Sequence, residues 1–387
     1  MERKEAELLY EQLFSRKAED LFTAAGRINV IGEHIDYCGG RVFPAALNLN
    51  CRVYGRKNGE NVIRVVASDF KEIITLDIDK LNDYRDLKWG NYQAGVAYYL
   101  QEKGIKLVGC DLLYDCTVPF GSGLSSSAAI EVSTAVALCE YAGVEYDKKE
   151  LALISQKAEN KYAGVNCGIM DQFASAMGKK DHAVLLDCST LEYEYVPLKL
   201  GDYCLVVANC NKPRSLQDSK YNERRGECEE ALAKLQTVIP TATCLADITP
   251  AQFDKVGKTV LSGKVYDRAK HVIEECARVI DSAKALEKGD ILAFGEFLNQ
   301  SHYSLRDLYE VTGDYLDALS ARAREFDGCI GSRMTGAGFG GCTVSLVKSD
   351  KVEEFIKYVD EKYYGDMGVR ASFYATSIEN GAQEIFD

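Results

Sequence analysis

The sequence of 387 residues lacks several features that would place it in a common protein class. No apolar run approaches the roughly 20 residues that a membrane-spanning helix needs. The four histidines are dispersed, at positions 34, 182, 271 and 302, which argues against a structural zinc site. No GxSxG motif is present, so acyl transfer of the hydrolase type has no support. We therefore expect a soluble protein without structural zinc.

Acidic residues also outnumber basic ones. The chain has 46 Lys and Arg residues against 59 Asp and Glu residues, a formal net charge of -13. Nucleic acids and anionic membranes bind basic surfaces, so neither is an expected partner. An anionic ligand would need a binding site built locally from a few residues.

The 14 cysteines do not indicate a disulfide framework, because they are scattered and none forms a CxxC pair. The chain opens with MERKEAELLYEQLF, which does not resemble a signal peptide. Reduced thiols in the cytoplasm fit this pattern better than disulfides in a secreted protein. The expected form is a cytoplasmic monomer.

The length predicts two domains, since single cores usually stop growing at about 250 to 300 residues. Helical and strand-like patterns alternate in both halves, which indicates an α+β fold. We expect an N-terminal domain over 1–200 and a mostly helical C-terminal domain over 201–387. Within the first domain, residues 85–103 are expected to form a helix that carries the only tryptophan, Trp89.

Residues 119–143 join a glycine- and serine-rich turn to an apolar helix. Gly121 and Gly123 let the backbone approach a ligand closely, and the free amides at the helix start favour an anion. Ser125, Ser126 and Ser127 then lie within reach of that anion. The stretch predicts a phosphate-binding turn, although a serine before a helix is also a common cap without any ligand.

Two other glycine-rich stretches mimic nucleotide motifs. Residues 336–341 satisfy the pattern GxGxxG, but a strand is expected to follow them where a dinucleotide fold has a helix. We interpret this turn as a backbone nest or a close-packing element. Gly257, Lys258 and Thr259 look like the end of a P-loop, yet Gln252 stands where that motif needs glycine.

A dense polar turn lies between residues 26 and 40. Glu33, His34 and Asp36 place three hydrogen-bonding side chains within four positions, which suits a polyhydroxylated sugar. A solvated polar loop is the alternative interpretation.

Three stretches together are more specific than any one of them. Residues 26–37, 119–129 and 335–341 resemble, in order and spacing, the three motifs of the galactokinase, homoserine kinase, mevalonate kinase and phosphomevalonate kinase (GHMP) superfamily. The first stretch is similar to the galactokinase signature, and residues 89–96, 168–172 and 219–228 extend the likeness. The resemblance implies a two-domain small-molecule kinase fold of α+β class, with the active site in the cleft between the domains.

The resemblance also implies roles for individual residues. Asp171 would act as general base or orient the sugar's anomeric hydroxyl, and Arg27 beside it would favour its ionised form and stabilise charge on the transferring phosphoryl group. Sugar contacts fall to Glu33, His34, Asp36, Gly168 and Tyr221. ATP binding falls to Ser68, Trp89, Gly121, Ser122, Gly123, Leu124, Ser125, Ser126 and Ser127. Magnesium ligation falls to Ser127 and Glu159.

Taken singly, three of these residues have ordinary alternatives. Asp171 is typical of a helix start, Glu159 of an exposed helix face, and Trp89 of an apolar core. The motifs around them favour the functional interpretation.

The activity that the resemblance implies is ATP-dependent phosphorylation of the anomeric hydroxyl of α-D-galactose, the first kinase step of galactose metabolism by the Leloir pathway. Ala25, Ile35 and Cys38 depart from the residues that many galactokinases carry. N-acetylgalactosamine, L-arabinose and galacturonate therefore stay open as alternative substrates. A sugar and ATP sensor without catalysis is a further alternative, which the intact serine-rich turn disfavours.

Overall fold

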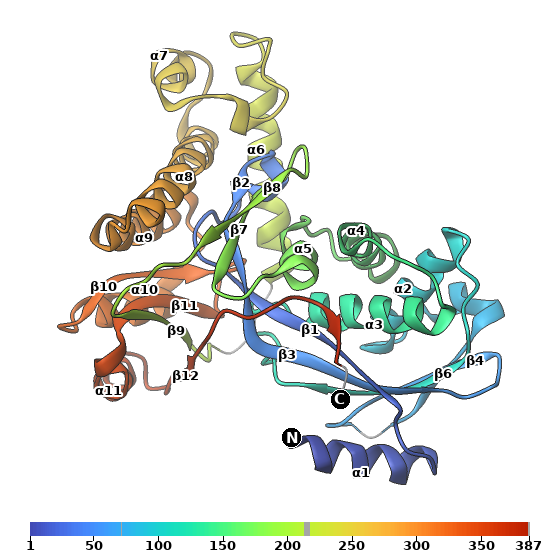
Figure 1. Cartoon of the computed structure of the whole chain (residues 1–387). Helices are drawn as coiled ribbons and strands as arrows, with labels where there is room; N and C mark the ends of the chain where they lie inside the picture. Colours follow the sequence, from blue (N-terminus) through green and yellow to red (C-terminus); the bar gives the residue numbers. More distant parts are fainter. Residues whose placement is uncertain (71, 213–216, 386–387) are drawn as a thin grey trace.

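A six-stranded sheet organises the first half of the chain (Figure 1). The computed structural model describes residues 1–70, 72–212 and 217–385. Neighbouring strands of the sheet run antiparallel except β4 and β6, which are parallel. In spatial order the strands are β13 (Gln383–Glu384), β1 (Asp20–Asn29), β3 (Pro44–Lys57), β6 (Cys110–Cys116), β4 (Val62–Ala67) and β5 (Ile74–Asp77).

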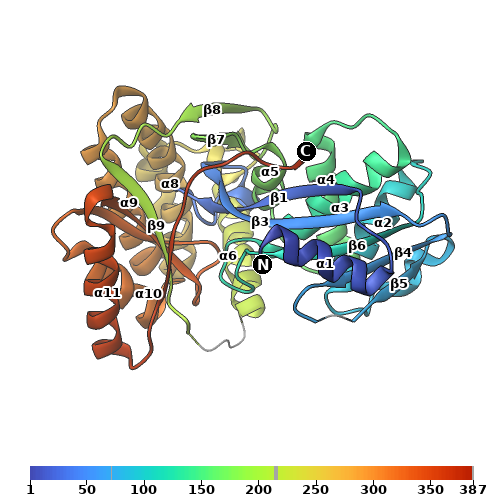
Figure 2. The ribbon, with the colours of Figure 1, turned by 60° about the horizontal axis from the view of Figure 1, so that its bottom comes forward.

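Helices cover both faces of this sheet (Figure 2). One face carries α2 (Gly90–Glu102), α3 (Ser126–Ala142), α4 (Lys148–Ala158) and α5 (Met170–Met177). The residues of α3 are mostly small or β-branched, and they are buried on nearly every side of the helix. This helix therefore lies between the sheet and the neighbouring helices. The amphipathic helix α1 (Arg3–Phe14) packs on the other face through Ala6 and Tyr10.

A four-stranded antiparallel sheet organises the second half. Its strands, in spatial order, are β10 (Cys329–Thr335), β11 (Cys342–Lys348), β9 (Tyr203–Asn209) and β12 (Ser372–Ala375). The helices α9 (Ile291–Ser304), α10 (Gly313–Arg324) and α11 (Val352–Met367) pack on and beside it. The architecture thus has two domains of mixed helix and sheet, although β13, near the end of the chain, returns to pair with β1.

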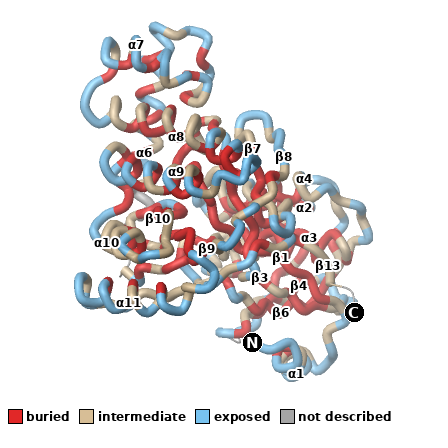
Figure 3. Tube along the Cα trace, turned by 60° about the vertical axis from the view of Figure 1, so that its left-hand side comes forward, coloured by how far each residue is buried: buried red, intermediate tan, exposed pale blue. Residues whose placement is uncertain are grey.

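A helical arm and a small sheet complete the structure. The arm contains α6 (Gln217–Leu235), α7 (Pro250–Val260) and α8 (Gly263–Lys288), and α7 at its end is largely exposed (Figure 3). The strands β2 (Arg41–Val42), β7 (His182–Asp187) and β8 (Tyr193–Pro197) form a three-stranded sheet that contacts both α8 and β3. In the part of the chain that the structure describes, no helix combines the length and apolarity that crossing a membrane requires.

Some elements differ from the sequence-based expectations. The helix expected over 85–103 begins only at Gly90, because residues 85–89 form turns between the 3-10 segment at 78–84 and the helix. The helix α7 was not predicted, although Thr249 and Gln252 form a capping box and Pro250 occupies its first turn. A strand precedes the turn at 336–341 as well as following it, so the turn closes a hairpin. The division of the chain near residue 200 stays a prediction.

Candidate active site

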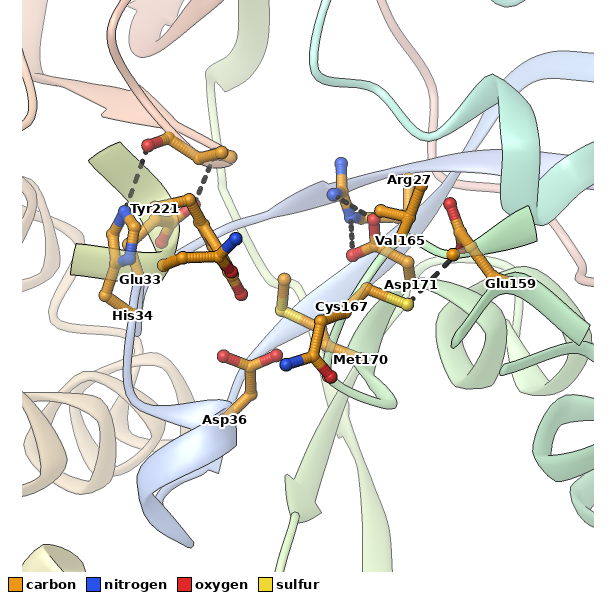
Figure 4. A pocket seen from close by; sticks show the side chains of 16 residues that line it. Arg27, Glu33, His34, Asp36, Glu159, Val165, Cys167, Met170, Asp171 and Tyr221 are labelled. Carbon is orange, nitrogen blue, oxygen red and sulfur yellow. Dashed lines mark hydrogen bonds and ion pairs between the residues drawn. The ribbon is translucent and has the colours of Figure 1, made fainter. Parts of the chain in front are cut away.

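A cavity of about 310 Å³ is lined from both halves of the chain (Figure 4). Its walls come from β1, the polar turn after β1, the loop before α5, the start of α5, the helix α6 and the turn between β10 and β11. Eight residues with a predicted role line it: Arg27, Glu33, His34, Asp36, Glu159, Gly168, Asp171 and Tyr221.

Arg27 and Asp171 form a bidentate ion pair at this cavity. Arg27 Nε donates to Asp171 Oδ1 at 2.8 Å, and Nη2 donates to Oδ2 at 2.6 Å. A β-bulge at Gly26 precedes Arg27, whose side chain is nearly buried while that of Asp171 is 26% exposed. Two parallel charge-assisted hydrogen bonds fix both side chains in one orientation. Asp171 therefore presents a held carboxylate to the cavity from the first turn of α5.

The glycine- and serine-rich turn lies directly behind this pair. Arg27 Nη1 donates to the carbonyl of Gly123 at 2.5 Å, and the hydroxyl of Ser125 donates to Asp171 Oδ2. Ser125 has a left-handed φ of 62° just before α3 begins, and its hydroxyl contacts Asp171 instead of capping the helix. The Ser122 hydroxyl is used inside the turn, where it donates to the carbonyl of Pro119 at 2.7 Å. Hydrogen bonds thus connect the turn to both predicted catalytic residues, Arg27 and Asp171.

Asp36 faces the cavity from the 3-10 turn that follows the polar loop. Burial, with the nearby charge of Asp171, raises the pKa of Asp36 to about 6. Gly168 stands against it so closely that a Cβ atom there would lie 1.8 Å from Asp36 Oδ2. A larger residue at position 168 would therefore displace the Asp36 carboxylate from its present place.

Both carboxylate oxygens of Glu33 accept hydrogen bonds from other residues of the chain. Its Oε1 accepts from the amide of Gly336 at 2.8 Å and from the Thr335 hydroxyl at 3.1 Å. Its Oε2 accepts from Asn29 Nδ2 at 2.8 Å and from the guanidinium of Arg333. The side chain is only 1% exposed. Glu33 thus holds the polar turn against the glycine-rich turn more than 300 residues away.

His34 makes a similar connection. Its Nε2 lies 3.0 Å from the carbonyl of Ala337, which can only accept, so Nε2 carries the proton and Nδ1 accepts from the Tyr37 hydroxyl at 2.8 Å. Burial, with the neighbouring His271, lowers the pKa of His34 to about 3. The ring of Tyr221 lies 5.5 Å from that of His34. The neutral imidazole of His34 and the ring of Tyr221 therefore line the cavity side by side, and Tyr37 supports the imidazole through a hydrogen bond.

Glu159 and Ser127 supply oxygen atoms suited to a divalent cation. The carboxylate of Glu159 is 6% exposed and lines the cavity, which excludes the exposed helix position that its sequence context allowed. The Ser127 hydroxyl hydrogen-bonds to this carboxylate. Burial, with the charge of Asp171, raises the pKa of Glu159 to about 7. No group of three or more acidic, histidine or cysteine ligands exists among the described residues. A Mg²⁺ ion fits this pair only with phosphate and water completing its shell, which is its common mode.

All nine predicted ATP residues lie outside the cavity lining, Trp89 and Ser68 among them. Trp89 precedes α2 and is half-buried, with its ring 6.5 Å from that of Phe70 and 6.2 Å from that of Tyr114. The amide of Ser68 donates to the carbonyl of Tyr114 at 2.9 Å. Ser68 and Trp89 therefore both contact Tyr114 of β6. Trp89 thus lies between the exposed ring of Phe70 and the buried ring of Tyr114, at the edge of the core.

The structure brings further residues to the cavity to which the sequence analysis assigned no sugar, ATP or metal contact. They are Gly164, Val165, Asn166, Cys167, Met170, Asn222, Gly336 and Ala337. Four of the eight belong to the loop before α5, whose only signal was its position beside Gly168 and Asp171. Ile35 and Cys38, which differ from the galactokinase pattern, are buried and do not line this cavity.

The turn at 336–341 packs backbone against backbone. A Cβ atom at Gly341 would lie 2.9 Å from the carbonyl oxygen of Ser122, and one at Gly336 would lie 3.1 Å from that of Gly123. The glycines thus let the hairpin turn approach the serine-rich turn closely. This close approach of the two backbones agrees with the interpretation of the turn as a close-packing element.

Family models match three parts of the chain. Residues 91–179 match the N-terminal domain of the GHMP kinases, residues 282–365 match the GHMP kinase C-terminal domain, and residues 8–57 match the galactokinase galactose-binding signature. A crystal structure of mevalonate kinase shares the fold, with a TM-score of 0.65 at 17% identity over 93% of this chain and 99% of that chain. Fold and site together define a small-molecule kinase of the GHMP class.

More similar relatives identify the family within this class of kinases. A galactokinase of Clostridium acetobutylicum is 45% identical over 380 residues, which cover 97% of either chain. The crystal structure of Lactococcus lactis galactokinase complexed with galactose has a TM-score of 0.94 at 39% identity, covering 99% of both chains. The chain belongs to the galactokinase family. It is accordingly an enzyme, and it uses ATP.

Proposed function

We propose that the protein transfers the γ-phosphoryl group of ATP to the anomeric hydroxyl of α-D-galactose, giving galactose 1-phosphate and ADP. The observation that carries this proposal is the bidentate pair of Arg27 and Asp171, placed between the serine-rich turn and a cavity of sugar size. The complex of the Lactococcus lactis relative with galactose supports the choice of sugar.

Asp171 acts on the attacking hydroxyl. Its carboxylate is held at both oxygens, so an incoming hydroxyl meets an acceptor whose position does not depend on the substrate. Asp171 orients that hydroxyl and takes its proton as the bond to phosphorus forms. Arg27 keeps a positive charge beside this centre, which offsets the charge of the transferring group.

The polar turn holds the sugar ring. Asp36 accepts hydrogen bonds from secondary hydroxyls when it is ionised, and Gly168 leaves room for it. Glu33 and His34 form the wall toward the hairpin turn, and Tyr221 closes the cavity from α6. Because Tyr221 lines the cavity, its hydroxyl can hydrogen-bond to a sugar hydroxyl there.

ATP places its phosphates over the turn at 121–127 and its adenine near Trp89 and Ser68. The amides at the start of α3 favour the phosphate charge. Mg²⁺, held by Ser127 and Glu159, would neutralise phosphate charge. We place this reaction in the cytoplasm and in a monomer, and the 14 free thiols suit a reducing compartment.

The test is ADP release by the purified protein with Mg-ATP and a panel of acceptors: galactose, N-acetylgalactosamine, L-arabinose, galacturonate, glucose, mevalonate and homoserine. We expect a strong preference for galactose. Asp171→Ala should abolish turnover while ATP binding stays nearly intact, and residual activity above about a hundredth of wild type contradicts the role given to Asp171. Activity on none of the sugars, with binding retained, would indicate a sensor.

A further inference from the structure

Two acidic side chains beside the cavity share one amide group. Gln172 follows Asp171 on α5 and its side chain is fully buried. Its Nε2 donates to Glu159 Oε2 at 2.5 Å and to Glu131 Oε2 at 3.1 Å. The amide thus connects the cavity wall at Glu159 to a carboxyl group on α3.

Glu131 is an unusual anchor for this amide. It is completely buried, and its charged neighbours are Glu159 and Asp171, both acidic. An isolated buried carboxylate is costly, and burial with these two neighbours raises the pKa of Glu131 well above its ordinary value. Among the described residues, Oε1 of Glu131 and Oε1 of Gln172 have no hydrogen-bond partner. In this part of the chain, the one hydrogen bond given to the Glu131 carboxyl group is thus the one from the Gln172 amide.

The position of Glu159 depends on this contact. Glu159 begins a π-helical turn (Glu159–Ala163) directly after α4, a local widening that is frequent at functional sites. Besides Gln172, its carboxylate meets the hydroxyl of Ser127 and the Cys167 thiol, which donates to it at 3.4 Å. Gln172 itself is held firmly, because α5 packs on both α3 and α4.

We infer that Gln172 is a positioning residue whose amide, anchored on Glu131, holds the Glu159 carboxylate toward Ser127 for the divalent cation of the nucleotide. This inference rests on the proposed function, in which Glu159 and Ser127 are the cation ligands. Hydrogen bonds to a ligating carboxylate commonly change metal affinity by about 10- to 100-fold when they are removed.

A core residue offers a matched control. Gln93 on α2 is 1% exposed, and in the described part of the chain neither Nε2 nor Oε1 of its amide has a hydrogen-bond partner. Gln93→Met and Gln172→Met both replace a buried amide with a thioether of similar length. Only the second removes hydrogen bonds to an acidic ligand.

The measurement is the binding of Mn²⁺ to the complex of enzyme and ADP, followed by electron paramagnetic resonance. We expect Gln172→Met and Glu131→Met each to raise the Kd of Mn²⁺ by about 10- to 100-fold. The double variant should bind no more weakly than Gln172→Met alone, because both residues act through one contact. Gln93→Met should stay within about twofold of wild type, and the affinity of Gln172→Met for galactose should be unchanged.

An equal Mn²⁺ affinity in Gln172→Met and Gln93→Met would overturn the inference. If Gln172→Met does not fold, Gln172→Asn keeps the amide but is one methylene too short to reach both acids, and it carries the same expectation. Glu159→Gln separates the two levels of the argument. If it leaves Mn²⁺ affinity unchanged, the proposed cation site fails; if it weakens binding while the Gln172 variants do not, only the positioning role fails.

Discussion

Substitution of Gly168 by alanine tests how the sugar site is built. A Cβ atom at this position would lie 1.8 Å from Asp36 Oδ2 and 2.6 Å from its Cγ. Real Cβ contacts essentially never fall below 3.0 Å, so the carboxylate or the loop must move by about 1.2 Å, the difference between 3.0 and 1.8 Å. The φ of Gly168 lies outside the left-handed region, so alanine meets no backbone strain there.

The expected result is a loss of sugar affinity with little effect on the nucleotide. A misplacement of about 1 Å can cost on the order of 100-fold, and a hydrogen bond to a charged group contributes about 1.5 to 3 kcal/mol. We expect Gly168→Ala to raise the KM for galactose by about 10- to 100-fold and to change the KM for ATP by less than about threefold. Steady-state kinetics with each substrate varied in turn measure both.

Gly164→Ala is the matched control in the same loop. A Cβ atom at Gly164 meets nothing within 4 Å, but its φ of +85° disfavours alanine. This variant therefore strains the loop by about 1 to 2 kcal/mol without touching Asp36. A KM for galactose within twofold of wild type in Gly168→Ala, or an equal rise in both variants, would refute the reasoning.

Three further predictions follow from other contacts of the site. Arg27→Lys keeps the charge but loses the fork that binds both oxygens of Asp171, so kcat should fall by about 10- to 100-fold in steady-state assays; a fall below threefold contradicts this. Burial raises the pKa of Asp36 to about 6, so below that pH its carboxylate becomes protonated and no longer accepts hydrogen bonds from the sugar. At saturating ATP, kcat/KM for galactose should therefore fall about tenfold per pH unit below pH 6. Asp36→Asn should have lower activity, and its pH profile should lack this inflection. Arg333→Met leaves the buried carboxylate of Glu33 without its cation and should lower the free energy of unfolding in urea by about 3 to 5 kcal/mol; a loss under 1 kcal/mol would show that Glu33 is stabilised otherwise.

Local chemistry explains what could be predicted. The glycine- and serine-rich turn before α3 could be located because glycines, serines and an apolar helix follow each other directly in the chain, and its predicted phosphate binding rests on backbone amides at a helix start that need no distant partner. The capping box of α7 is a local signal of the same kind, and it was present but overlooked. The resemblance of three motifs added the class of enzyme and the candidate residues.

Long-range contacts could not be predicted in this way. Glu33 is identified by the sequence as a polar residue in a turn, but its four donors include the amide of Gly336 and the guanidinium of Arg333, about 300 residues away. The neutral tautomer of His34 likewise depends on the carbonyl of Ala337. These contacts arise because the hairpin of β10 and β11 packs against the polar turn, and no local propensity specifies that packing.

The amino-acid sequence by itself determined the segments that we predict to bind phosphate and sugar, since composition, glycine spacing and the start of a helix act over a few neighbouring residues. Only the tertiary structure decided how they work together. It brought Arg27 to Asp171 across 144 positions, raised the pKa of Asp36 by burial beside another acid, and gave Gln172 two carboxyl groups to hold. Burial and hydrogen-bond geometry belong to the packed chain, because both depend on which distant elements exclude water from the same space.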